Sequence, residues 1–148
     1  MVDGWTVRHD RAATAAYYAT LTQGDADRCG CSFCRNFALQ RATAFPADFL
    51  RLLDRLGVDA AKEHEVYEMG PAADGLRLYA GWLCSMGDFT GPEAGVGAFE
   101  ERRFSFGFTD SFPRPGNPPR ESVVAVAFPM PLPWLLPDEE PDERAGDA

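Results

Sequence analysis

The chain has 148 residues and a net charge of −9 at pH 7, and 45% of its residues are hydrophobic. This length fits one domain with a sizeable core, and the composition is that of an ordinary globular protein. The acidic balance argues against a partner that binds through negative charge, such as a nucleic acid or an anionic membrane surface. No apolar run approaches the roughly 20 residues of a membrane-spanning helix.

The residues at the two ends of the chain give predictions about the location of the protein and about order in its tail. The N-terminus lacks the basic start and apolar segment of an export signal, so we expect a cytoplasmic protein. Its cysteines should then be reduced, which favours metal binding or free thiols over structural disulfides. Six acids and one arginine lie within residues 137–148. We therefore expect a disordered acidic tail there, after a single globular domain at residues 1–136.

The first third of the chain predicts mainly helices. Asp10 and Ser32 are residue types that cap helix N-termini, and a helical pattern follows each of them. The expected elements are a strand at residues 5–9, a helix at 11–21, a polar loop at 24–28 and a helix at about 33–43.

The clearest helix follows Pro46, which suits the first position of a helix. Hydrophobic side chains then recur at the spacing of one helix face. Gly57 is suited to end the helix, because glycine readily adopts the left-handed conformation common at helix C-termini. The repeated positions are Phe49, Leu52, Leu53 and Leu56.

The remainder of the chain predicts strands. Alternating or β-prone segments are separated by clusters of glycine, proline and aspartate. Four prolines within residues 129–137 argue against a helix or a central strand there, because each proline removes a backbone donor. The expected elements are strands at residues 65–69, 76–86, 99–108 and 121–128, a turn at 73–75, and loops at 87–97 and 110–120.

This order of elements predicts an α+β fold in which N-terminal helices pack on a mostly antiparallel sheet of three to five strands. Three acids near the first strand, Glu63, Glu65 and Glu68, are expected to form a solvated edge. Asn36 is expected either to hydrogen-bond the backbone of the preceding cysteine segment or to lie on a helix surface.

Three of the four cysteines lie within six residues, and we call Cys29, Cys31 and Cys34 the cysteine cluster. Thiolates are preferred zinc ligands, and short spacings between them are typical of structural zinc sites. Gly30 would let the backbone turn between two neighbouring ligands, and Cys34 would fall in the first turn of the next helix. The spacing therefore predicts a site for zinc or a similar metal.

A closed zinc site needs a fourth ligand. Cys84, in a predicted strand, is our candidate, with His9 or His64 as substitutes. Arg28 and Arg35 flank the cluster and would offset its negative charge. Such a metal would be structural, and the protein would act as a binding or interaction module for an unknown protein or small molecule.

Two alternatives stay open. The first is a thiol redox enzyme or sensor, because Cys31 and Cys34 form a C-x-x-C pair at a helix start, where the helix dipole lowers a thiol pKa. The other is an interaction domain without any metal. No phosphate-binding loop, dinucleotide glycine pattern or Ser-His-Asp arrangement is visible.

The run Cys-Gly-Cys-x-x-Cys-Arg-Asn-Phe at residues 29–37 resembles a family of small uncharacterised bacterial proteins. The similarity covers most of the chain outside the tail. The resemblance implies a single bacterial domain marked by this cysteine motif, and it implies no particular reaction. The further segments that carry it are Phe45-Pro46, Gly57-Val58-Asp59, Glu65-Val66-Tyr67, Tyr79-x-Gly81-Trp82 and Pro133-Trp134.

Overall fold

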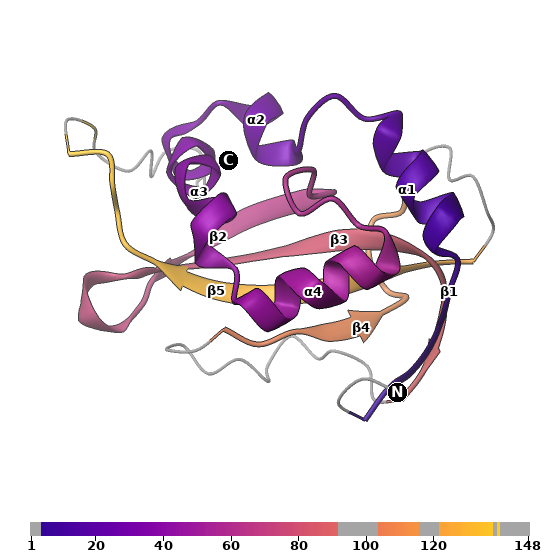
Figure 1. Cartoon of the computed structure of the whole chain (residues 1–148). Coiled ribbons are helices and arrows are strands. Elements are labelled where there is room, and N and C mark those ends of the chain that lie inside the picture. Colours follow the sequence, from indigo (N-terminus) through magenta and orange to yellow (C-terminus); the bar gives the residue numbers. More distant parts are fainter. Residues whose placement is uncertain (1–3, 92–103, 116–121, 138, 140–148) are drawn as a thin grey trace.

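Helices gather on one side of a curled antiparallel sheet in the computed structural model (Figure 1). The structure describes residues 4–91, 104–115, 122–137 and 139, and within these it confirms the expected α+β fold with four α-helices and five strands. The helices are α1 (Arg11–Ala19), α2 (Asp25–Cys29), α3 (Ser32–Ala44) and α4 (Ala47–Leu56). The strands are β1 (Thr6–His9), β2 (Glu65–Pro71), β3 (Arg77–Thr90), β4 (Gly107–Thr109) and β5 (Val123–Leu132).

Strand β3 organises the sheet. The strand order is β1-β3-β5-β4, and β2 also pairs with β3. Along one edge of β3, β2 pairs as far as Trp82 and β1 begins at Gly87. Helix α1 fills the gap between them, since the Tyr18 hydroxyl donates to the Cys84 carbonyl at 2.7 Å and the Thr14 hydroxyl accepts from the Met86 N–H at 3.0 Å. Side chains of α1 thus satisfy backbone groups that neither β1 nor β2 reaches.

Helix α4 confirms the helical pattern read from the sequence. Its apolar stripe is buried, and Gly57 ends the helix in a left-handed conformation with φ of 83°. Aromatic rings from Phe37, Phe45 and Phe128 complete the centre of the core between the helices and the sheet. The buried side chains of the stripe are Phe49, Leu52, Leu53 and Leu56.

The prediction of a polar loop at residues 24–28 is wrong, because helix α2 occupies Asp25–Cys29. The sequence shows no apolar periodicity there. The helix is instead held by polar contacts with distant residues, which no local pattern reveals.

The loop expected from Gly87 begins too early, since β3 continues to Thr90. Strand β1 pairs with this extension, placing Arg8 opposite Asp88 and His9 opposite Gly87. A side chain at Gly87 would put its Cβ only 2.0 Å from the Arg8 carbonyl oxygen, so glycine is required by this close approach. The rest of the predicted loop, residues 92–97, lies outside the described residues.

The strand expected at residues 99–108 is present only as β4, Gly107–Thr109. Residues 104–106 have no regular structure, and residues 99–103 lie outside the described part. The acidic tail also falls outside it, apart from Pro137 and Glu139.

Strand β5 continues through Pro129 and Pro131 to Leu132, so the predicted end of this strand at residue 128 is too early. The two prolines pair in register with Ala80 and Leu78 of β3. Among the described residues, β4 pairs with β5 only as far as Ala127, so β5 has one strand neighbour at its proline end. Two residues apart, both prolines turn their nitrogens to the same unpaired edge, where no donor is needed.

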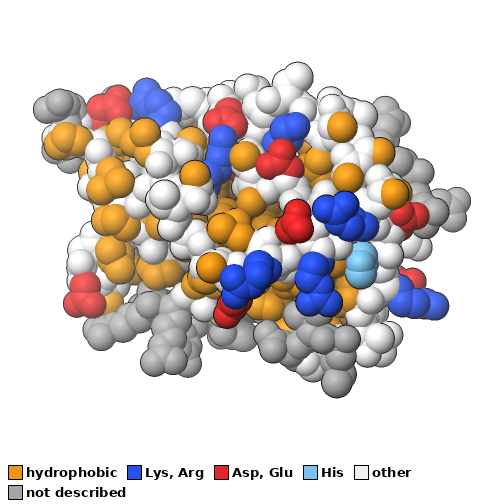
Figure 2. Space-filling model, in the orientation of Figure 1, with side chains coloured by type: hydrophobic (Ala, Val, Ile, Leu, Met, Phe, Trp, Pro, Cys, Tyr) orange, Lys and Arg blue, Asp and Glu red, His pale blue; other side chains and the backbone are white. Residues whose placement is uncertain are grey.

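Charged side chains on the helix side lie largely next to opposite charges. Figure 2 shows basic groups beside acidic ones on this face. The ion pairs of the helices include Arg11–Asp54 and Arg51–Asp48. Among the described residues, no helix combines the length and the apolar character needed to cross a bilayer.

Candidate metal centre

The cysteine cluster lies at the corner where α2 turns into α3. Cys29 is the last residue of α2, and Gly30 follows in a left-handed conformation with φ of 72°. Cys31 is the N-cap of α3, and Cys34 lies in its first turn. The left-handed glycine reverses the chain within one residue, and it thereby brings the three sulfurs within 4.8 Å of one another.

Cys31 caps α3 through its own sulfur, which accepts a hydrogen bond from the Cys34 N–H at 3.4 Å. The sequence favoured Ser32 for this role, and that prediction is wrong by one residue. Ser32 is instead the first residue of the helix and is buried. The left-handed Gly30 sets where the helix begins, so the cap falls on the residue directly after it.

The three thiols differ in exposure and in acidity. Cys29 is exposed, Cys31 is intermediate and Cys34 is buried. The pKa of Cys29 is lowered because the Cys31 backbone N–H donates to its sulfur, with further contacts from the Cys31 and Cys34 thiols. The pKa of Cys34 is raised, chiefly by burial and then by its sulfur neighbours. One side of the cluster thus faces water and the other faces the core.

This arrangement can hold one metal ion. Thiolate sulfurs bind zinc at about 2.3 Å, so three sulfurs this close can share a single ion after small side-chain movements. All four cysteines of the chain are free, with no disulfide between them. The identity of the metal is a separate question, because several thiophilic ions accept such ligands.

Cys84 is not a member of this sulfur group. It is fully buried in β3, where it packs with Met86 and Val123 and, from α1, Ala13 and Tyr17. Burial raises its pKa to about 12. The structure therefore places the predicted fourth ligand among apolar side chains, in an environment that favours a protonated thiol.

The two candidate substitutes for the fourth ligand also lie outside the group. His9 is in β1, opposite Gly87 of β3. His64 precedes β2, and its Nε2 is in hydrogen-bond contact with the Pro113 carbonyl. The sulfur group that can share an ion thus consists of the cysteine cluster alone among the described residues.

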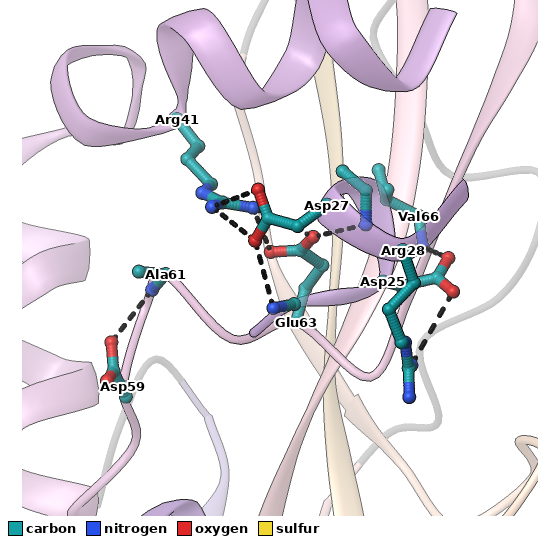
Figure 3. A network of polar contacts seen from close by, with 10 residues as sticks. Asp25, Asp27, Arg28, Arg41, Asp59, Ala61, Glu63 and Val66 are labelled. Atoms are coloured by element: carbon teal, nitrogen blue, oxygen red, sulfur yellow. Dashed lines mark hydrogen bonds and ion pairs between the residues drawn. The ribbon is translucent and has the colours of Figure 1, made fainter. Parts of the chain in front are cut away.

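A buried acid holds the start of α2, and Figure 3 shows the network around it. Glu63 is only 2% exposed, and its Oε1 accepts from the Ala26 N–H at 2.8 Å and from Arg41 at 3.1 Å. Arg41 also donates to both carboxylate oxygens of Asp27, at 2.9 and 2.7 Å. One arginine of α3 therefore ties together α2 and the segment before β2.

Asp25 makes a second connection between α2 and the sheet. Its Oδ2 accepts from the Val66 N–H of β2 at 3.1 Å, and its own N–H donates to the Glu63 carbonyl at 3.1 Å. Its Oδ1 lies 3.7 Å from Arg28. The contacts with Val66 and Glu63 both lie at the first residue of α2, so the helix reaches Cys29 with its other end already anchored.

The prediction that Glu63 belongs to a solvated edge is wrong. Burial raises the pKa of this carboxyl, and the Ala26 N–H and Arg41 partly oppose the shift. Glu68 also has a partner, Arg77, in a pair with little exposure. The missing signal was the counter-charge, since Arg41 is distant in sequence and looks like an ordinary helix-surface residue.

Asn36 is fully buried, so both expectations for it are wrong. Its amide nitrogen donates to the Tyr79 hydroxyl at 3.3 Å and to the Pro133 carbonyl at 3.1 Å, and its Oδ1 accepts from the Leu135 N–H at 2.8 Å. The Tyr79 hydroxyl donates in turn to the Phe33 carbonyl at 2.8 Å. These bonds fix the first turns of α3 against β3 and the segment that follows β5.

Neither a family model, nor a curated protein, nor a solved structure matches this chain. The geometry of the cysteine cluster and its supports therefore carries the functional argument.

Proposed function

We propose that this chain is a metal-binding domain in which Cys29, Cys31 and Cys34 hold one zinc ion. The observation that carries the proposal is the approach of the three sulfurs to within 4.8 Å at the α2–α3 corner. Zinc is the choice of ion because it binds thiolates and is the common metal of structural cysteine sites. Reduced thiols are required, and a cytoplasmic location would supply them.

The role that fits this placement is structural. Helix α2 has only five residues, and a helix this short has little stability of its own. Glu63 and Asp25 hold its start, and the metal would hold its end at Cys29 against α3. The ion would thus complete a polar attachment where little apolar surface is available.

The charge balance of the site is favourable for zinc. Three thiolates and a divalent ion carry a net charge of −1, which two neighbouring arginines partly offset. Each arginine also has an acidic partner, Asp25 for Arg28 and Glu139 for Arg35. Because the two arginines and their two carboxylates cancel, these groups together with the ion and its thiolates would carry a net charge of −1.

We infer that the domain is a binding or interaction module rather than an enzyme, with a protein or small molecule as its partner. The net charge of −9 supports the exclusion of nucleic acid.

Metal analysis of the full chain, purified under reducing conditions without chelators, tests the proposal. We expect about one zinc per chain. Replacing the three clustered cysteines by serine should remove the metal, whereas the matched control Cys84→Ser should retain it. Metal-free wild-type protein, or equal zinc content in the triple variant, would contradict the proposal.

One observation favours a second function, a thiol redox pair formed by Cys31 and Cys34. Cys31 lies at the N-cap of the 13-residue helix α3, where backbone N–H groups stabilise a thiolate. Alkylation rates of the metal-free protein against pH would decide it. A thiol that titrates near the ordinary value of about 8.5 gives this function no support.

A further inference from the structure

The cysteine cluster supplies three ligands, and the other candidate donors have contacts of their own. The Asp25 carboxylate binds the Val66 N–H and Arg28. His64 contacts the Pro113 carbonyl, and Cys84 is buried against Met86 and Val123. Within the described residues, none of these side chains joins the three sulfurs in a group that can share an ion.

The open side of the cluster is the one that faces solvent. Cys34 is buried beneath the corner, whereas Cys29 is exposed at the end of α2. An ion bound by these sulfurs would be shielded on the Cys34 side and accessible beside Cys29. Zinc sites with three protein ligands keep such an accessible position for an exchangeable ligand.

We propose that the fourth position of this centre takes a thiolate that comes from another molecule. The inference rests on the proposed metal site. A fourth thiolate suits an ion that already has three soft sulfur ligands better than water does. The incoming thiol loses its proton to the solvent, a water molecule leaves, and a metal–sulfur bond forms, so no oxidant or reductant is needed.

This ligand gives the interaction module a definite recognition chemistry. The centre would capture a free low-molecular-weight thiol. A second copy of the chain is a poor source of the thiolate, because its clustered cysteines would hold its own ion and its Cys84 is fully buried. Binding would be reversible and would depend on the metal. It would also depend on pH, because a thiol must be deprotonated to become a ligand.

Cobalt(II) substituted into the full-length chain tests the inference, since its visible and near-ultraviolet bands report the number of bound sulfurs. The protein is kept reduced with a phosphine and titrated with 2-mercaptoethanol, with ethylene glycol as the oxygen analogue. We expect saturable growth of the sulfur-to-cobalt band at one thiol per cobalt, and no response to ethylene glycol. No response to the thiol, or an equal response to both compounds, would overturn the inference.

Two controls separate the remaining outcomes. Cys84→Ser should leave the cobalt spectrum and the thiol response unchanged, and loss of a sulfur band in this variant would show that Cys84 is the fourth ligand and overturn the inference. Light scattering checks the source of the thiolate: a monomer that binds the thiol supports a free thiol, and a metal-dependent dimer that 2-mercaptoethanol dissociates would overturn the inference. Failure of cobalt to bind at all would instead reject the metal site itself.

Discussion

Helices α4 and α2 are attached to this protein in opposite ways. Helix α4 buries four large apolar side chains along one stripe. Helix α2 has a single buried apolar residue, Ala26, and is held by the Glu63 carboxylate and by Asp25. Its other end carries Cys29 and the proposed metal. One helix is thus attached by apolar area and the other by directional contacts.

The two kinds of attachment suit different tasks. Burying one large apolar side chain contributes about 1.5–3 kcal/mol and tolerates small displacements, because the effect scales with area. A buried ion pair contributes little net stability, since desolvation offsets the attraction, but it fails badly when one partner is lost. Helix α4 therefore serves the stability of the fold, and the contacts of α2 serve the position of Cys29.

The largest effect is expected in the core. Phe49→Ala should lower the free energy of unfolding by about 3–5 kcal/mol, because the truncation leaves a cavity among packed rings. Urea unfolding measures this change, and the metal content of the folded fraction should be unaltered. The exposed Arg55→Ala on the same helix is the control and should stay within about 0.5 kcal/mol of wild type. Loss of metal from folded Phe49→Ala protein would break the contrast between the two helices.

Glu63→Gln is expected to have a smaller effect on stability and a larger one on the metal. The glutamine amide keeps one acceptor oxygen, but it replaces Oε2, which also accepts from Arg41 at 3.2 Å, with an NH2 donor and removes the negative charge that Arg41 faces. The cost should be about 1–3 kcal/mol. Zinc affinity should fall by roughly tenfold, as when outer contacts of a metal site are lost. Competition with a chromophoric chelator measures the affinity. An unchanged affinity would show that α2 does not position Cys29.

The same variant gives a prediction about pH. Because burial raises the native pKa of Glu63, the native state binds more protons than the unfolded state above the ordinary pKa of about 4.3. The contribution of this carboxyl to stability is therefore lost as the pH rises from that value through the raised native pKa. The stability advantage of wild type over Glu63→Gln should shrink across this window, as urea unfolding at several pH values would show. A growing advantage would mean that Arg41 outweighs burial.

Two glycines that end the two helices provide a closer comparison. Gly57 and Gly30 both have positive φ, so alanine should cost about 1–2 kcal/mol at either site. A Cβ at Gly57 would also lie 2.5 Å from the Arg11 carbonyl oxygen, whereas Gly30 has open space. Gly57→Ala should therefore destabilise more in thermal unfolding, and Gly30→Ala should chiefly weaken zinc binding. The reverse order would contradict this account of the corner.

Thiol labelling is expected to separate the two regions without any change in stability. Exposed Cys29 has a lowered pKa, whereas burial raises that of Cys84 to about 12. In the metal-free folded protein at pH 8, iodoacetamide should modify Cys29 first and Cys84 last, and zinc should protect Cys29. Peptide mapping by mass spectrometry measures the order. Early modification of Cys84 would show that β3 opens more readily than its burial implies.

Prediction from the sequence succeeded where the signal lies within one element, either as hydrophobic residues at helical spacing or as a capping residue at its start. The stripe of α4 follows helical spacing, and Asp10 caps α1 by accepting from the Ala13 N–H. It failed where the partner is distant in sequence. Glu63 was expected to be solvated because its partner Arg41 lies on another element. The burial of Asn36 was not predicted because its partners, Tyr79, Pro133 and Leu135, all lie far along the chain.

The sequence alone predicts the α+β class, the apolar face of α4 with its end at Gly57, and the close spacing of the three clustered cysteines, because each depends on local periodicity or on neighbouring residues. Pro46, expected at the first helical position, is instead the N-cap of α4. The folded structure is needed to show that residues 25–29 are helical, that Glu63 is a buried anchor and that Cys84 is not part of the cluster. These features depend on which strand and helix faces meet, and that follows from the packing of the whole chain.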